Sequence, residues 1–259
     1  MKRCSLCLFL ILVSGFSGCV SQTHKPAPQA ITVMTYNVEN LFDSLDDPGK
    51  EDETYLPIEA KKTPQHRIQC TKLSRKWRRQ QCMETDWSED KIKRKISRLA
   101  DVILQVKNGE GPDVLVLQEV ENLNILERLR QNGLGEAGYK EAVLIEGPDS
   151  RGIDVAMLSK LPQVNKAKLH EIQLDYIDRK TGQVDKTKEA RPTRGILQAQ
   201  FALPDGQTLT VLGVHFPSQG SPTPARKKAL QRLEEVRQAL PKDSYIIAAG
   251  DFNITASED

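Results

Sequence analysis

Several short motifs that mark common hydrolases and nucleotide-binding proteins are absent from this sequence of 259 residues. It has no Gly-x-Ser-x-Gly nucleophile elbow, no Gly-x-x-x-x-Gly-Lys phosphate loop and no His-Glu-x-x-His zinc pair. The usual serine hydrolase, P-loop and zinc protease arrangements are therefore excluded. The composition, 38% hydrophobic and 28% charged, is that of an ordinary globular chain with one substantial core.

A long apolar run is also lacking. The run at residues 6–13 is too short for a membrane-spanning helix of about 20 residues. It follows Lys2 and Arg3 and precedes several small residues, which predicts a signal peptide over residues 1–18. An uncleaved anchor is the alternative interpretation.

The end of this segment, Phe16-Ser17-Gly18-Cys19, resembles the lipobox that directs lipidation of a cysteine. We therefore expect Cys19 to carry lipid and residues 19–30 to form a tether. Val20 follows the cysteine instead of Asp, which favours the outer membrane, with the protein facing the periplasm. A plain secretory signal without lipid is the alternative.

Cysteine is scarce, with five in the chain, two of them inside the predicted signal peptide. With Cys19 lipidated, Cys70 and Cys82 are the thiols that remain, and an oxidising periplasm would let them form a disulfide. A structural zinc site is disfavoured because it needs four ligands and only His66 lies near these cysteines in sequence.

The predicted mature chain also lacks an excess of positive or negative charge. Removal of residues 1–18 takes away two basic residues and no acidic one, which leaves 35 of each kind. The distribution is uneven, since the segment from Lys61 to Met83 contains Trp77, no acidic residue and a set of basic ones. Contact with phosphates or membrane headgroups and a merely solvated loop remain alternatives there. The basic residues are Lys61, Lys62, Arg67, Lys72, Arg75, Lys76, Arg78 and Arg79.

Strands and helices are predicted to alternate through most of the chain. Residues 43–87 lack periodicity and predict a long loop or insertion, of a length that is usually functional. Pro204-Asp205-Gly206 predicts a turn between two antiparallel strands. The second long helix begins at Thr223-Pro224, with Leu230, Leu233, Val236 and Leu240 on its apolar side. The predicted strands are 31–38, 113–118, 141–146, 153–159, 195–203, 208–215 and 244–249, and the predicted helices begin at Ser88, Asn122 and Thr223.

This order predicts an α/β fold in which two mixed sheets pack face to face with helices outside them. Four polar motifs follow predicted strands, where a rigid sheet can aim side chains at one pocket. Taken singly, each has an ordinary explanation, such as a turn former, a solvated strand end or a hydrogen-bonded core histidine. The motifs are Tyr36–Asn40, Gln118–Glu121, His215–Ser218 and Gly250–Asn253.

Together the four motifs favour metal-assisted chemistry at a phosphate ester. A hard divalent cation prefers oxygen ligands such as the carboxylate of Glu119 and the amide oxygen of Asn37. Asp251 can orient or deprotonate a water, and His215 and Asn253 can hydrogen-bond the charge that develops on phosphorus oxygens.

In this order, the motifs resemble the endonuclease/exonuclease/phosphatase family, from about Ile31 to Ile254. The resemblance implies a four-layer α/β sandwich with its site at one edge of the paired sheets, and a domain spanning residues 31–259. It implies Mg²⁺, or alternatively Mn²⁺ or Ca²⁺, bound by Asn37 and Glu119. The implied catalytic residues are His215, Asp251 and Asn253.

Two further positions are placed by the same resemblance. The segment Arg151–Ala156 is similar to the family's central strand motif. Arg194 stands where the family has an arginine on the substrate phosphate, with a surface ion-pairing side chain as the alternative.

The family pattern continues beyond the Gly-Asp-Phe-Asn motif to a second carboxylate and an Asp-His motif, whereas this sequence ends at Asp259. The resemblance therefore implies a C-terminally incomplete domain with its last strands missing and with doubtful activity. We expect a monomer that acts as a nuclease on nucleic acid. A phospholipid or sphingolipid phosphodiesterase or phosphatase is the enzymatic alternative, and an inactive truncated lipoprotein is the non-enzymatic one.

Overall fold

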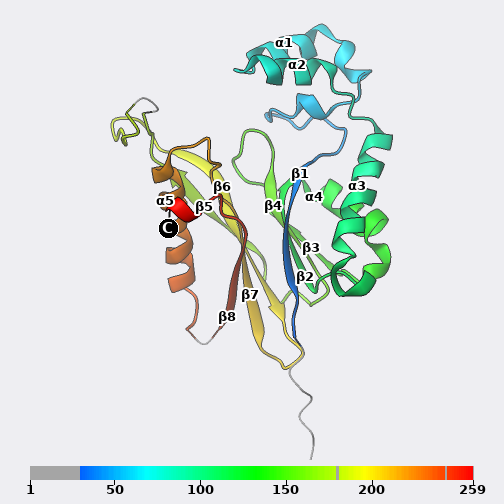
Figure 1. Ribbon diagram of the computed structural model, residues 1–259, viewed down its shortest axis with the longest axis vertical. Helices are drawn as coiled ribbons and strands as arrows, with labels where there is room; N and C mark the ends of the chain where they lie inside the picture. The colour runs from blue at the N-terminus through cyan, green and yellow to red at the C-terminus, as the bar shows by residue number, and fades with distance from the viewer. Residues whose placement is uncertain (1–29, 179–180, 243, 259) are drawn as a thin grey trace, which may run out of the picture.

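The computed structural model describes residues 30–178, 181–242 and 244–258. The predicted signal peptide, Cys19 and the tether up to residue 29 lie outside the described residues. Two four-stranded sheets stand face to face with helices on their outer sides, as Figure 1 shows. The expected four-layer α/β sandwich is confirmed. Within the described ranges, no helix is both long enough and apolar enough to span a membrane.

The first sheet has the strand order β1-β2-β4-β3. β1 (Val33–Leu41) pairs in parallel with β2 (Val114–Val120), because the intervening helix returns the chain to the same end of the sheet. β2 pairs antiparallel with β4 (Asp154–Ser159), which in turn pairs antiparallel with β3 (Glu141–Leu144). The continuous apolar pattern of β2 is explained, since neighbouring strands and layers bury it on both faces.

The second sheet has the order β5-β6-β7-β8. β6 (Arg191–Ala202) and β7 (Thr208–His215) form the predicted antiparallel hairpin. β8 (Tyr245–Asp251) pairs in parallel with β7. β5 (Lys168–Leu174), which the sequence did not predict as a strand, forms the other edge.

Helices cover the outer face of each sheet. α3 (Glu89–Ile103) buries a stripe of Ile92, Ile96, Leu99 and Ile103 against the first sheet, together with α4 (Leu123–Arg128). α5 (Thr223–Gln238) covers the second sheet through Leu233 and Val236. Leu230 is exposed, so its predicted place on the apolar side is wrong: Ala225 and Ala229 lie on the buried side instead. Short helical turns occur at Val106–Gly109, Leu129–Gly133, Gly135–Ala137 and Ala256–Glu258.

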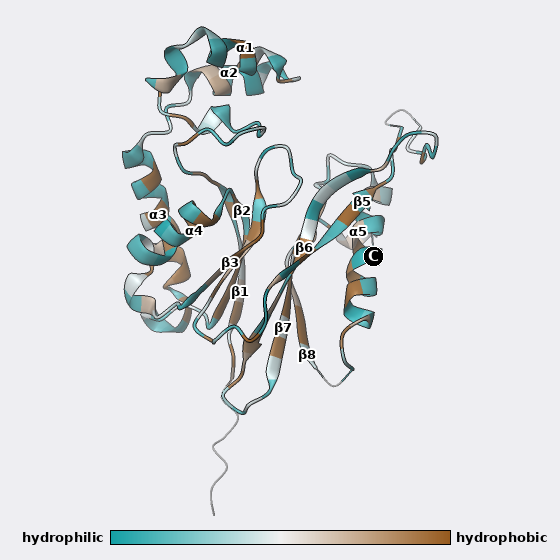
Figure 2. Cartoon of the chain, turned by 180° about the vertical axis from the view of Figure 1, so that it is seen from behind, coloured by the Kyte–Doolittle hydropathy of each residue, from teal (hydrophilic) through white to brown (hydrophobic). Residues whose placement is uncertain are grey.

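The inner faces of the two sheets meet in an aliphatic core, seen as brown strands in Figure 2. They approach closely at Gly213 on β7, where a Cβ atom would lie 2.7 Å from Val155 Cγ1 and 2.9 Å from Met157 Cε. Glycine therefore lets the sheets pack tightly just below the strand ends that carry the polar motifs.

Residues 53–84 form a small helical subdomain, here called the helical insertion, and the expectation of a long loop is wrong for this segment. Its helices are short and polar, so their spacing carries no helical period that sequence inspection could detect. Cys70 and Cys82 form a disulfide between them, with a Cα–Cα distance of 5.6 Å. In Figure 1, α1 and α2 lie beyond the end of the sheets at which the chain leaves β1. The elements are η1 (Glu53–Tyr55), η2 (Ala60–Lys62), α1 (Pro64–Lys72) and α2 (Lys76–Glu84).

Candidate active site

The four polar motifs meet at one edge of the paired sheets. In the first sheet, Asn37 on β1 is the register partner of Gln118 on β2, directly before Glu119. In the second sheet, His215 on β7 is the register partner of Asp251 on β8. Because both pairs are parallel, their carboxyl ends lie at the same edge, and packing of the sheets brings the two edges together.

Glu119 and Asp251 face one point from different sheets. Asn37 Nδ2 lies 3.5 Å from Glu119 Oε1 and 3.4 Å from Asp251 Oδ2. His215 Nε2 lies 3.8 Å and 3.9 Å from the same two oxygens. The two carboxylates, one from each sheet, therefore flank the same pair of nitrogens.

The backbone at Glu119 is strained in a way that directs its side chain. Glu119 has φ of 66°, in the left-handed region that glutamate seldom adopts, and the pairing of β2 with β4 shifts between Gln118 and Val120. A local irregularity of this kind re-aims a side chain at the end of a strand. Strained residues persist where the surrounding fold fixes them, and they concentrate at functional sites.

His215 is held neutral. Its side chain is 4% exposed, and burial, followed by the charges of Arg194 and Arg151, lowers its pKa to about 3. Nδ1 is buried and has no hydrogen-bond partner among the described residues. The imidazole therefore provides a neutral hydrogen-bonding group beside the two carboxylates instead of a cation that would offset their charge.

Asn253 is tied to the same cluster by its backbone and by its side chain. Its backbone N–H donates to Asp251 Oδ1 at 3.0 Å, which fixes the orientation of that carboxylate. Its Nδ2 donates to the backbone oxygen of Phe216 at 3.1 Å, the oxygen that also accepts from Arg194 Nη2 at 3.3 Å. Asn253 has φ of 52°, a left-handed conformation that asparagine adopts more readily than most residues, where the Gly-Asp-Phe-Asn turn leaves β8.

Arg194 lies behind the cluster and is 7% exposed, so the alternative of a surface side chain is wrong. Its Nη1 is 3.9 Å from Asp149 Oδ2, and its Nε is buried without a partner among the described residues. Burial lowers the pKa of Arg194, and the charges of Asp149, Glu119 and Asp251 act in the opposite direction. The guanidinium therefore places a positive charge behind the carboxylates.

The donor set fits a hard divalent cation. Glu119 and Asp251 contribute two converging carboxylates, and the nearest side-chain nitrogens belong to a neutral amide and a neutral imidazole. The amide oxygen of Asn37 accepts from the backbone N–H of Glu39 at 3.0 Å, so ligation by that oxygen requires the side chain to turn. Glu119 and Asp251 are therefore the carboxylates available to a cation at this edge, and Asn37 is the hydrogen-bonding neighbour of both.

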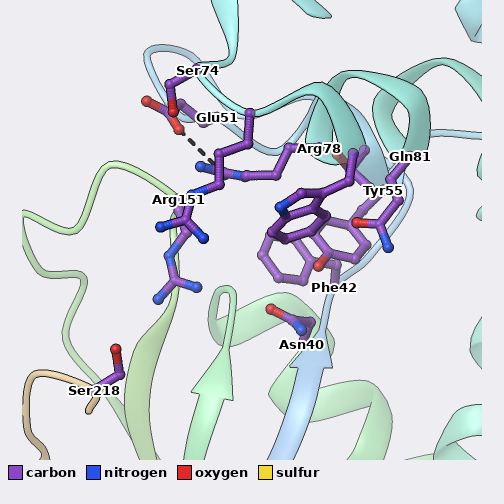
Figure 3. Close-up of a pocket in the computed structure, with 12 residues that line it drawn as sticks. Asn40, Phe42, Glu51, Tyr55, Ser74, Arg78, Gln81, Arg151 and Ser218 are labelled. Carbon is purple, nitrogen blue, oxygen red and sulfur yellow. Dashed lines mark hydrogen bonds and ion pairs between the residues drawn. The ribbon is translucent and has the colours of Figure 1, made fainter. Parts of the chain in front are cut away.

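A cleft of about 740 Å³ opens between this edge and the helical insertion (Figure 3). Asn40 and Ser218, from two of the polar motifs, line its lower part, and Arg151 reaches toward them. The insertion contributes Arg75, Arg78 and an exposed aromatic side chain, Trp77. The other lining residues are Phe42, Glu51, Thr54, Tyr55, Ser74 and Gln81.

The cleft carries more positive than negative charge. Arg75, Arg78 and Arg151 line it together with one acidic residue, Glu51, which accepts from Arg78 Nη2 at 3.4 Å. Sequence reasoning had signalled the basic run around Trp77 but not Arg151 as a site residue. Lys61 is not part of this surface, because its Nζ is buried and donates to the backbone oxygens of Thr54 and Cys82 at 2.8 and 2.9 Å.

The model of the Endonuclease/Exonuclease/phosphatase family matches residues 32–79 and 79–258. The chain belongs to this family, whose members hydrolyse phosphodiester bonds. A search of curated proteins finds no match to the chain.

Solved structures of the same fold are similar to the chain at low sequence identity. An endonuclease/exonuclease/phosphatase from Beutenbergia cavernae DSM 12333 is 20% identical with a TM-score of 0.46, over 61% of this chain and 42% of that one. TDP2 of D. rerio, humanized by 14 mutations, is 17% identical with a TM-score of 0.48, over 88% and 68%. Sphingomyelinase C from Streptomyces griseocarneus is 20% identical with a TM-score of 0.44, over 63% and 60%. The chain thus spans less than half of the first of these structures.

Proposed function

We propose that this protein is a Mg²⁺-dependent phosphodiesterase that cleaves nucleic acid. The observation that carries the proposal is the position of the convergent Glu119–Asp251 pair beside a cleft lined by arginines and Trp77. Arginine side chains contact phosphates, and an exposed aromatic ring offers a face on which a base can stack. The basic cleft extends the substrate contact beyond the scissile phosphate.

Each side chain of the cluster has a role that its geometry supports. Asp251, oriented by the backbone N–H of Asn253, can accept a proton from the attacking water. Neutral His215 can donate from Nε2 to a phosphate oxygen, and the positive charge of Arg194 behind it can stabilise the same group. A bound Mg²⁺ would be held by Glu119, beside Asp251, and would neutralise charge on the phosphate oxygens.

A plasmid-nicking assay, run with Mg²⁺ and with EDTA, tests this proposal. We expect Mg²⁺-dependent nicking that Asp251→Asn abolishes. Release of phosphocholine from sphingomyelin vesicles is measured in parallel. Cleavage of sphingomyelin without nicking of the plasmid would change the proposed substrate to lipid phosphodiesters. Absence of both activities would refute the proposal.

The contribution of the cleft is tested separately with Trp77→Ala and Arg78→Ala. We expect KM for single-stranded DNA to rise by roughly tenfold for Trp77→Ala, in line with about 1–3 kcal/mol for one stacked base. KM should also rise for Arg78→Ala, because that change removes a contact to phosphate. Cleavage of bis-nitrophenyl phosphate, which is too small to reach the insertion, should not change. Arg67→Ala is the matched control, because Arg67 is exposed on α1 but does not line the cleft. Equal effects of Arg67→Ala and Arg78→Ala on KM would contradict a specific role of Arg78 in binding DNA at the cleft.

We also propose that the protein is anchored to the outer membrane through lipid on Cys19. The support is the lipobox-like sequence Phe16–Cys19 after a short apolar run. Cys19→Ala should move the protein from the membrane fraction to the soluble periplasmic fraction. Retention of the variant in the membrane fraction would argue for another anchor.

A further inference from the structure

A second group of carboxylates lies apart from the catalytic cluster, between the segment that follows β1 and the turn that follows β2. It comprises Asp43, Asp47, Asp52 and Glu121, here called the acidic cluster. One carboxylate oxygen from each of Asp47, Asp52 and Glu121 lies within 4.8 Å of the others. Asp52 is 1% exposed and Glu121 is 2% exposed, so water does not solvate these charges.

In each of the two buried carboxylates, one oxygen accepts a hydrogen bond and the other oxygen does not. Asp52 Oδ2 accepts from the backbone N–H of Asp47 at 2.8 Å, and Glu121 Oε2 accepts from the backbone N–H of Asp43 at 2.7 Å. The second oxygens, Asp52 Oδ1 and Glu121 Oε1, are buried and have no partner among the described residues. A buried polar atom without a partner is costly, and a bound water or ion is one way to satisfy it.

The charge of the acidic cluster is also uncompensated. Among the described residues, no lysine, arginine or histidine forms an ion pair with any of its four members. Neutral amides hydrogen-bond the carboxylate of Asp43: its Oδ2 accepts from Asn122 Nδ2 at 3.2 Å and from Asn124 Nδ2 at 2.8 Å. Burial, joined by the charges of Asp46 and Glu53, raises the pKa of Asp52 to about 7.

We propose that the acidic cluster is a Ca²⁺ site in which Asp47, Asp52 and Glu121 are the carboxylate ligands. All of the donors are oxygens, which excludes the nitrogen and sulfur sets typical of structural zinc. Mg²⁺ usually retains several of its waters, and the burial of Asp52 and Glu121 leaves little space for them. Ca²⁺ accepts irregular oxygen cages and dehydrates more readily.

Asp43 positions this site instead of binding the ion. Its carboxylate holds the amides of Asn122 and Asn124, and its backbone N–H holds Glu121. A Ca²⁺ ion here would join the segment that leads into the helical insertion to the turn that follows Glu119 on β2. It would thereby stabilise the approach of the insertion to the active-site edge.

Calcium binding to the full-length chain tests the proposal. The catalytic cluster is first disabled by Glu119→Gln and Asp251→Asn, so that the remaining binding reports the acidic cluster. Isothermal titration with CaCl₂ after EDTA treatment should then show one ion per chain. Ca²⁺ at about 100-fold above its Kd should raise Tm by roughly 5–10 °C.

Variants made in the same background separate binding from folding. Asp52→Asn and Glu121→Gln should each abolish the titration signal and the Ca²⁺-induced rise in Tm. In EDTA both variants should melt at or above the temperature of their parent, because each removes a buried negative charge. Asp154→Asn is the matched control: Asp154 is another buried carboxylate, outside the cluster, and its loss should leave Ca²⁺ binding unchanged.

Three results would overturn the proposal. The first is an absence of Ca²⁺ binding in the disabled background, which would mean that protons alone neutralise the cluster. The second is equal binding before and after Asp52→Asn. The third is a lower Kd for Mg²⁺ than for Ca²⁺ in the titration.

Discussion

His215 and Asp251 are register partners on the parallel strands β7 and β8, and their side chains approach to 3.9 Å between Nε2 and Oδ2. A one-residue change in register would send one of the two side chains to the opposite face of the sheet. The pairing of the strands is therefore part of the geometry of the candidate site. Gly250 contributes to it, because a Cβ at this position would overlap the backbone oxygen of Val214 on β7.

Replacing His215 tests whether a neutral donor acts on the phosphate. His215→Ala should lower kcat by about 10²–10³, the usual cost of losing one preorganised hydrogen-bond donor. Single-turnover cleavage of plasmid DNA at saturating Mg²⁺ measures this effect. His170→Ala is the control, because His170 lies on β5 with Nε2 2.7 Å from Gln198 Oε1, and this variant should leave kcat unchanged. A small effect at His215, with unfolding unaltered, would assign the histidine a packing role.

Glu119→Gln tests the assignment of this side chain to the cation. The change removes the ligand charge but keeps the shape, so the Mg²⁺ concentration for half-maximal activity should rise by roughly 10–100-fold. Activity is measured over a Mg²⁺ titration at fixed substrate. Glu136→Gln, on a surface turn, is the control. An unchanged Mg²⁺ dependence in Glu119→Gln would remove this residue from the metal site.

The four motifs of the active site were predictable because each follows a strand whose apolar pattern is distinct. Strand direction alone then brings Asn37, Glu119, His215 and Asp251 to one edge. The sequence pattern could not indicate that Asn37 turns its nitrogen toward the carboxylates. The orientation of this amide depends on the hydrogen bond that its oxygen accepts from the N–H of Glu39.

The remaining features depend on contacts that no periodicity records. The helices of the insertion are stabilised by the disulfide and by caps such as Thr63, whose side chain accepts from the His66 N–H at 3.2 Å. Arg151 joins the cleft because its loop lies below the insertion. The acidic cluster unites residues more than 65 positions apart, Asp52 and Glu121, and so has no local signal.

Removal of the disulfide should affect the insertion more than the rest of the fold. Few apolar side chains hold α1 to α2 apart from Leu73, Met83 and the two cysteines. The double change Cys70→Ser and Cys82→Ser should therefore cost about 2–3 kcal/mol in the stability of this subdomain. Limited proteolysis should cut within residues 60–85 of the variant while the sheets remain protected.

The same variant should raise KM for single-stranded DNA, because Trp77 and Arg78 lose their fixed position at the cleft. Treatment of the wild-type protein with dithiothreitol should reproduce both effects and leave the double variant unchanged. Equal rates of proteolysis in the oxidised and reduced proteins would show that the bridge does not hold the insertion.

The last prediction concerns pH and rests on Asp154 at the start of β4. Its carboxylate is buried, Oδ1 accepts from the backbone N–H of Gly147 at 2.9 Å, and burial raises its pKa to about 7. Lys50 lowers this pKa, whereas Asp149 and Glu146 raise it further. In the unfolded chain the group returns to its ordinary pKa near 3.8.

Between these two values the folded protein binds the additional proton, so the free energy of unfolding should fall as pH rises from about 4 to about 7 and level off above that range. One proton limits the slope from this group to about 1.4 kcal/mol per pH unit. Asp154→Asn removes the ionisation while retaining an oxygen for the Gly147 N–H. Urea unfolding in EDTA at intervals from pH 4.5 to 8 should therefore show the two stability curves diverging, with the variant gaining on the wild type as pH increases. Asp52 titrates equally in both proteins and cancels from the difference. Parallel curves across this range would mean that Asp154 stays ionised in the folded protein. Lys50 would then offset the effect of burial on the pKa of Asp154.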